Sequence, residues 1–302
     1  MKPNPGVQNM EPLNIPRVEK VKVDESIVRK FNSEEDYTGL SLDLLIETGS
    51  YVCIAGNLST TESQKWSRDE ALLGGHIVRL YKLISGLLDQ TCQHRREIGF
   101  ILCRLAFECV VNLRYLIKHA SPKLFESYIA YSLKHEKQLR DTILSNVKAR
   151  GGAPQEIEQR MLKSIEISFK TSGLKSEDVR AADLKNWGGK SIYDKAKDLG
   201  LEAAYLAAFG GGSHNVHGNW QDLLEYHPET HDDGSFTPVF EWHPLRPQLL
   251  NVISLFAIEA IIDYLTYLAP IEFKQIFQAL DELEKRILLL ERLHEEFLSK
   301  GK

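Results

Sequence analysis

Apolar residues recur along most of the chain at intervals of three and four, the spacing that places them on one face of an α-helix. This spacing predicts helices over residues 40–57, 64–93, 95–119, 123–150, 176–185, 191–199, 201–209, 245–268 and 271–298, with another starting at Pro154. Gly74 and Gly75 predict a break in the second of these helices. Residues 226–247 instead form a polar segment with a turn and strand-like flanks. The predicted fold class is all-α, a multi-helix bundle with a short irregular or hairpin insertion near 226–247.

The domain boundaries follow from where this periodicity starts and stops. Residues 1–38 combine proline and charge with little periodicity, which predicts an extended or disordered N-terminal arm before a single helical domain over 39–300. Gly151 and Gly152 separate two helices that are expected to form an antiparallel hairpin. The last helix, 271–298, has a stripe of apolar residues that is expected to dock on its own bundle rather than form a coiled coil. The stripe consists of Ile276, Leu280, Leu283, Ile287 and Leu290.

Charge and composition narrow the range of partners. The 302-residue chain has a formal net charge of -5, so a broadly basic nucleic-acid surface is excluded and any such binding is local. The longest apolar stretch, 249–269, contains Asn251, Glu259 and Asp263, which suits a buried bundle helix better than a membrane span. The N-terminus has no apolar core of a secretory signal. These features predict a cytoplasmic protein that does not enter a membrane.

The helix over 95–119 is apolar on nearly every side, so its charged residues stand out. Arg104 and Glu108 are four residues apart and therefore share one helical face. One interpretation is an internal ion pair that fixes packing, and the other is a polar pocket completed by other segments. On the same helix Arg114 and His119 fit the R-x4-6-H pattern of the HEPN ribonucleases, although a histidine in a last helical turn is also favoured by the helix dipole.

The segment "FGGGSHNVHGNW", residues 209–220, is the second candidate site. Its three glycines end one helix, and Ser213 is a suitable N-cap for a new helix running through His214, His217 and Leu223. Backbone N–H groups at such a turn bind phosphate, so Gly211, Gly212 and Ser213 are candidate phosphate ligands and His217 a candidate general base.

Two other interpretations of this segment stay open. It is also explained as a capped helix whose histidines satisfy local hydrogen bonds. A metal site is a further alternative, although the ligand spacing matches no standard zinc pattern and no cofactor is expected. Its candidate ligands are His214, His217, His227, His231 and His243, with Asp232 and Asp233 beside them.

The two stretches together resemble the bacterial family catalogued as domain of unknown function 5677. The resemblance covers about residues 65–265 and rests on an arginine and glutamate four apart, then a tryptophan, a tyrosine, and a serine followed by a histidine four residues later. In this chain these positions are Arg104, Glu108, Trp187, Tyr205, Ser213 and His217. The family is helical and its motif is similar to HEPN domains of toxins and antiviral systems. Gly210 stands where a HEPN-like motif would have an arginine ahead of its histidine.

The resemblance implies a HEPN-like protein that cleaves RNA without a metal, as a homodimer, in stress response, toxin activity or phage defence. His217 would accept the proton of a ribose 2′-hydroxyl, Arg104 would stabilise charge on the phosphate, and Glu108 would orient Arg104. Ser213 would hold the phosphate. The alternatives are a non-catalytic binding module, in which an Arg-Glu-Ser-His network fixes the bundle, and a metal-dependent hydrolase using the 214–243 histidines.

Overall fold

The computed structural model describes residues 16–58, 65–179, 185–206, 216–268 and 273–300. The helices of this part are α1 (Glu25–Val28), α2 (Glu34–Asn57), α3 (Arg68–Cys92), α4 (Arg96–Lys118), α5 (Pro122–Ser132), α6 (Lys134–Ala149), α7 (Glu156–Ser172), η1 (Trp187–Gly189), α8 (Ile192–Asp198), α9 (Glu202–Ala204), α11 (Trp220–Tyr226), α12 (Pro247–Leu268) and α13 (Lys274–Lys300). Strands β1 (Pro228–Thr230) and β2 (Phe236–Pro238) pair antiparallel, with Glu229 opposite Thr237. The all-α class and the hairpin insertion are thereby confirmed.

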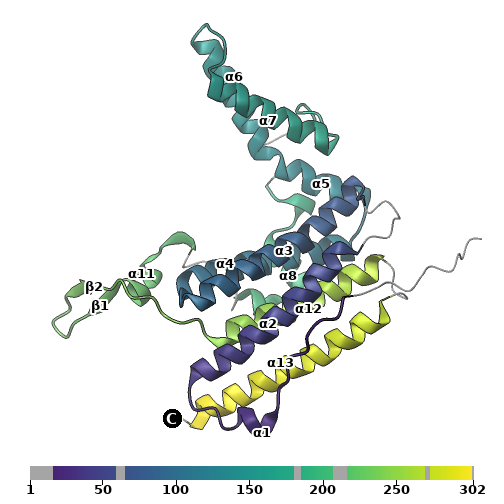
Figure 1. Ribbon diagram of the computed structural model, residues 1–302. Coiled ribbons are helices and arrows are strands. Elements are labelled where there is room, and N and C mark those ends of the chain that lie inside the picture. The colour runs from purple at the N-terminus through teal and green to yellow at the C-terminus, as the bar shows by residue number, and fades with distance from the viewer. Residues whose placement is uncertain (1–15, 59–64, 180–184, 207–215, 269–272, 301–302) are drawn as a thin grey trace, which may run out of the picture.

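Four long helices enclose the main core. Helix α2 packs on α3 and α12, and α4 packs on the same two helices from the opposite side, so the four form a closed ring of neighbours (Figure 1). Helix α13 lies along α12 and α2 (Figure 1). Helices α3 and α4 are joined by residues 93–95, where His94 adopts the left-handed backbone conformation with φ of 57°. This ring holds α4 at the centre of the molecule.

Local signals in the sequence explain where the first helices begin. Ser33 and Asp36 cap α2 reciprocally, and Ser67 and Glu70 do the same for α3. Helix α2 therefore starts at Glu34, not at residue 40. The break expected at Gly74 is wrong because α3 continues through it. The glycine serves packing, since a Cβ there would lie 2.7 Å from the Trp66 ring.

The predicted arm is ordered over its described part. Residues 16–24 run without helix, and Val18, Val21 and Val23 pack against the main core. The Val21 N–H donates to Glu47 of α2 at 2.9 Å. Apolar contact and this hydrogen bond hold the segment against the bundle. Residues 1–15 of the arm lie outside the described residues.

Helices α6 and α7 form the expected hairpin and project from the bundle (Figure 1). The helix expected over 123–150 is divided at Leu133, which is buried with Ile165 and Phe169 of α7 in a small separate core. This contact accounts for the turn between α5 and α6, for which the local sequence contains no breaker. The helix expected over 176–185 is a turn where it is described, up to residue 179.

The two C-terminal helices complete the bundle. All five residues of the α13 stripe are buried against the core, which confirms that the stripe docks on its own bundle. Two helices, α3 and α12, are long and apolar enough to cross a membrane by length and composition alone. Such segments also form the cores of helical bundles, and here both belong to the central ring.

Candidate functional site

A polar stripe runs along the otherwise apolar α4. Arg104, Glu108 and Asn112 are spaced by four residues, which places them one above another on one helical face. All three are partly buried, while Phe107 and Val111 between them are fully buried in the core. The sequence predicted the first two, and the structure extends the stripe by one turn to Asn112.

Tyr205, just after α9, lies near the part of this stripe that contains Arg104 and Glu108. Burial raises the pKa of its hydroxyl, while the charge of Arg104 opposes this rise and that of Glu108 adds to it. The Tyr205 ring contacts those of Phe107 and Tyr193, at centroid distances of 6.5 and 5.2 Å. The contact with Phe107 places Tyr205, which the family resemblance groups with Arg104 and Glu108, against the same helix as those two residues.

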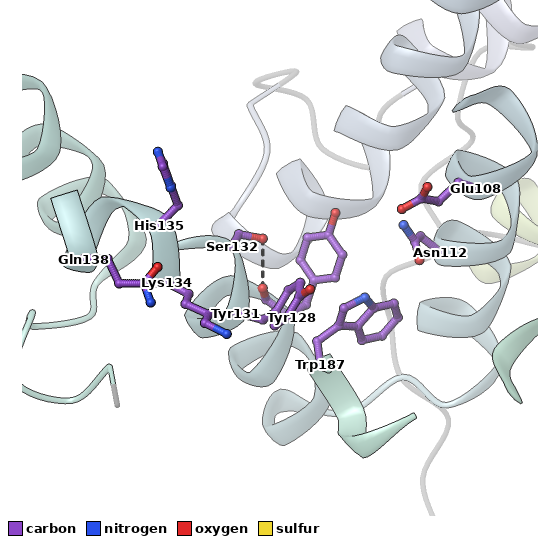
Figure 2. Close-up of a pocket in the computed structure, with 9 residues that line it drawn as sticks. All are labelled: Glu108, Asn112, Tyr128, Tyr131, Ser132, Lys134, His135, Gln138 and Trp187. Atoms are coloured by element: carbon purple, nitrogen blue, oxygen red, sulfur yellow. Dashed lines mark hydrogen bonds between the residues drawn. The ribbon is translucent and has the colours of Figure 1, made fainter. Parts of the chain in front are cut away.

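The part of the stripe formed by Glu108 and Asn112 opens into a cavity of about 360 Å³. Glu108 and Asn112 lie on one side of it and His135 and Gln138 on the other, with aromatic rings between them (Figure 2). The complete lining consists of Glu108, Asn112, Tyr128, Tyr131, Ser132, Lys134, His135, Gln138 and Trp187. The cavity thus joins the predicted Glu108 and Trp187 to α5 and the start of α6, which sequence reasoning had not connected with the site.

Trp187 reaches the cavity because of the glycines that follow it. Gly188 and Gly189 have φ of 62° and 71°, a conformation that other residues adopt with strain. The Gly188 N–H donates to Ser127 Oγ at 2.9 Å and ties this turn to α5. Trp187 is consequently buried, with 5% of its surface exposed, and its ring contacts those of Tyr115 and Tyr128 edge-on.

Lys195 of α8 lies behind Trp187 and was missed by the sequence analysis. It is 2% exposed, its Nζ is 3.6 Å from the Trp187 ring centroid, and it donates to the Lys190 carbonyl at 2.7 Å. Burial lowers its pKa to about 8, against the opposing influence of Asp194 and Glu108. The available signal was its position three residues after Ile192 and one before Ala196, on the apolar face of a helix capped by Ser191.

Behind Tyr128 is a further buried polar group. Cys109 Sγ lies 3.5 Å from His76 Nδ1 and donates to the His76 carbonyl at 3.3 Å. Burial lowers the pKa of His76 to about 4 and raises those of Cys109 and Tyr128 to about 12. All three groups are uncharged at neutral pH, so this cluster supplies neither a thiolate nor an imidazolium, and Tyr128 keeps its hydroxyl proton.

Arg114 and His119, the candidate R-x4-H pair, have separate partners. Arg114 forms ion pairs with Glu259 and with Asp263, the latter at 2.7 Å, and so ties α4 to α12. His119 Nε2 lies 2.7 Å from Asp198 Oδ2, and this contact is the main cause that lowers the pKa of Asp198 to about 2. The two residues thus connect α4 to different neighbours.

Two further arginines next to the start of α4 also have separate partners. Arg95 lies over the Trp242 ring, 5.6 Å from its centroid, and Arg96 Nε donates to the Pro244 carbonyl at 2.7 Å. Both hold the segment around β2 against the start of α4. Of the arginines at 95, 96, 104 and 114, Arg104 is therefore the one that the structure places beside Glu108 and Tyr205.

The glycine-rich segment is described only from Val216 onward. Gly211, Gly212, Ser213 and His214 lie outside the described residues, as does Gly210. The continuous helix expected from His214 to Leu223 is wrong, because Gly218, with φ of 56°, interrupts it and Asn219 caps a new helix, α11. His217 is exposed in the short helical stretch that ends at Gly218.

The described histidines of the insertion have different neighbours. His227 Nε2 lies 3.6 Å from Glu97, His231 Nε2 lies 3.0 Å from Thr237 Oγ1, and the His243 ring is 6.4 Å from that of Tyr226. Over the described ranges, His, Cys, Asp and Glu residues form no group of three that could hold a metal ion.

Comparison with known proteins gives one match. No curated protein and no solved structure matches the chain. A model for a family of unknown function matches residues 70–235, a range that includes Arg104, Glu108, Trp187, Tyr205 and His217 and ends before α12. This match confirms the family resemblance read from the sequence, and the chain belongs to the family of unknown function DUF5677.

Proposed function

We propose that the protein cleaves RNA without a metal ion, at the face of α4 that carries Arg104 and Glu108. The observation that carries this proposal is the packing of Tyr205 on Phe107 of α4, beside Glu108 and one turn from Arg104, within the family region. A cation and a hydroxyl are groups that bind and stabilise a phosphodiester, and a carboxylate beside the cation can orient it.

The proposed reaction is an internal transfer of the phosphodiester. His217 takes the proton of the 2′-hydroxyl, the 2′ oxygen attacks phosphorus, and the bond to the 5′ oxygen breaks. The departing 5′ oxygen takes a proton from solvent, leaving a 2′,3′-cyclic phosphate and a 5′-hydroxyl. Arg104 stabilises the charge on the phosphate and Glu108 orients it, while Ser213 is assigned the phosphate contact that the sequence predicts. Tyr205, whose pKa is raised by burial, adds a hydroxyl donor on the same helix face in this proposal.

A second candidate is a non-catalytic module in which the α4 polar groups fix the bundle or bind a ligand. The exposed position of His217, outside the partly buried stripe of α4, favours this candidate. Here His217 would have no chemical role, and the polar stripe would act through binding alone.

One experiment separates these candidates. Single-stranded and structured RNA are incubated with the wild type, Arg104→Lys and His217→Ala, each with and without EDTA. The matched control is His231→Ala, an exposed histidine of the hairpin insertion. Cleavage that survives EDTA, yields cyclic phosphate ends and is lost in His217→Ala supports the proposal. Intact RNA in every sample supports the non-catalytic module, and cleavage abolished by EDTA supports a metal-dependent hydrolase.

We further propose that the protein acts in the cytoplasm as a homodimer, without entering a membrane. Helix α11 and the insertion after it expose several large apolar side chains, of which Phe240 is 86% exposed, and such exposure is typical of interaction surfaces. The others are Trp220 and Leu223 of α11 and Phe236 and Trp242 of the insertion. Sedimentation of the wild type and Phe240→Ser tests this: a dimer that the variant weakens supports it, and a monomeric wild type contradicts it. The family resemblance suggests stress response, toxin activity or phage defence as the setting.

A further inference from the structure

The cavity beside Trp187 combines three kinds of group that recognise one class of ligand. Its inner side has hydrogen-bonding groups of α4, its middle is aromatic, and its outer side carries Lys134 and His135 (Figure 2). We propose that this cavity binds a nucleobase with an exocyclic amino group, presented by single-stranded RNA or by a free nucleotide. The proposal deepens the proposed function and rests on it only in taking RNA as one source of the base.

The inner side is suited to accept hydrogen bonds from an amino group. Glu108 contributes a carboxylate, and Asn112 Oδ1 is buried without a hydrogen-bond partner among the described residues. A buried acceptor without a partner is unfavourable, so a ligand that donates to it recovers this cost on binding. Adenine, cytosine and guanine each carry an exocyclic amine that can donate to such oxygens, and uracil does not.

The middle of the cavity is suited to a flat ring. Trp187, Tyr128 and Tyr131 line it, and the edge-on contacts of Trp187 with Tyr115 and Tyr128 fix the indole in place. Proteins that recognise single-stranded RNA stack unpaired bases on such rings while reading the edges by hydrogen bonds. A volume of about 360 Å³ is within the range of small-ligand pockets.

Charge distinguishes a nucleotide from an organic cation, which aromatic rings beside a carboxylate can also bind. The buried Lys195 lies 3.6 Å from the Trp187 ring centroid, and Lys134 stands at the outer side of the cavity. These two ammonium groups oppose a cationic ligand. Lys134 and His135 instead suit a phosphate attached to a base that lies deeper in the cavity. The groups around the cavity therefore favour a nucleotide.

The test measures binding in EDTA by the His217→Ala protein, so that cleavage does not consume the ligand. Fluorescent oligomers of adenosine, cytidine and uridine are titrated, and AMP and UMP are titrated separately by calorimetry. We expect adenosine and cytidine oligomers to bind about tenfold or more tightly than uridine oligomers. We expect Asn112→Leu to remove this preference, and Lys134→Ala to weaken all oligomers alike. The matched controls Glu126→Gln and Lys123→Ala change exposed residues of α5 outside the cavity and should bind as the parent does.

The outcomes decide the proposal and its source of ligand. Preference for amino bases in RNA alone assigns the pocket to RNA, and the same preference for AMP over UMP assigns it to free nucleotides. Equal binding of all bases, no binding, or binding of tetramethylammonium in place of nucleotides overturns it. Should Asn112→Leu unfold, the base preference of the unmodified pocket still decides. RNA cleavage without base preference would reject this inference alone, whereas base-specific binding without cleavage would reject only the nuclease.

Discussion

Two carboxylates in this protein, one buried and one partly buried, have opposite surroundings. Glu47 of α2 has 1% of its side chain exposed, and Arg286 of α13 binds both of its oxygens at 2.7 Å. The Val21 N–H donates to the same carboxylate. Glu108 of α4, in contrast, lines a cavity next to Asn112, whose Oδ1 has no partner among the described residues.

The difference indicates what each group does. A buried charge whose bonds are all made within the fold holds elements together, here α2, α13 and the N-terminal segment. A carboxylate that faces a cavity beside an unsatisfied oxygen contributes little to folding and is placed to meet a ligand. Burial alone thus does not identify a functional charge. The useful sign is whether the polar groups around it have hydrogen-bond partners within the fold.

The largest expected effect on stability comes from breaking the buried Glu47–Arg286 pair. Glu47→Gln leaves the Arg286 guanidinium without its counter-charge in a mostly buried site, so the free energy of unfolding should fall by about 3 kcal/mol. Urea denaturation measures this. Lys20→Ala, which removes the exposed Lys20–Glu282 pair, is the control and should cost less than about 1 kcal/mol. Equal losses of stability in the two variants would show that the buried pair contributes no more to stability than the exposed one.

Replacing Glu47 by Leu and Arg286 by Met together sharpens this prediction. Since no charge is then left buried, the double variant should recover most of the stability lost in Glu47→Gln. A double variant no more stable than the single one would mean that the pair contributes more than the cost of an unpaired charge.

The next effect concerns Lys195, the cation behind the open cavity. Its pKa is lowered to about 8, so the folded state disfavours its charged form. This cost is fully present below pH 8 and disappears as pH rises through the ordinary lysine value of 10.5. The stability of the wild type relative to Lys195→Met should therefore rise by roughly 3 kcal/mol between pH 8 and pH 10.5.

Urea denaturation of both proteins over this pH range is the measurement, because other titrating groups contribute equally to each and cancel in the difference. Lys197→Met, at an exposed position of α8, is the control. A difference between wild type and Lys195→Met that does not change with pH would mean that Lys195 is hydrated.

The sequence was most informative about features that depend on a single helix, such as its bounds and its buried face. Helix α4 was expected over 95–119 and spans Arg96–Lys118, since its nearly continuous apolar sequence allows no other role than a core helix. The α13 stripe was correct for the same reason. The division at Leu133 could not be predicted, because it depends on contacts with α7 and not on any breaker in the local sequence.

The candidate site shows the same limit. The four-residue spacing of Arg104 and Glu108 on an apolar helix was visible in the sequence and marked the correct face. Tyr128 and Lys195 were not found, because α5 and α8 meet α4 only in the folded chain and a lysine is ordinarily exposed. Helix periodicity identifies a polar face, and only the packing of other helices shows what that face encloses.

A smaller effect is expected at the far end of α4. Arg114→Ala removes ion pairs to Glu259 and Asp263, both of which stay partly in contact with water, so the loss of stability should be about 1 kcal/mol. RNA cleavage, if present, should persist, because Arg114 joins α4 to α12 instead of facing Glu108. Loss of cleavage in a folded Arg114→Ala protein would mean that Arg114, as part of the R-x4-H pattern, takes part in the reaction.

The smallest expected change in stability is that of Glu108→Gln, the same substitution as in the buried Glu47–Arg286 pair. Because Glu108 faces a cavity, its charge is solvated and its removal should alter the free energy of unfolding by less than about 1 kcal/mol. Binding of adenosine oligomers and RNA cleavage should nevertheless fall, because the variant loses an acceptor oxygen and the partner that orients Arg104. Glu126→Gln on α5 is the control for both measurements. If Glu108→Gln instead lowers the free energy of unfolding as much as Glu47→Gln does, the bonds of Glu108 are made within the fold. The polar stripe on α4 would then stabilise the bundle and would not be placed to bind a ligand.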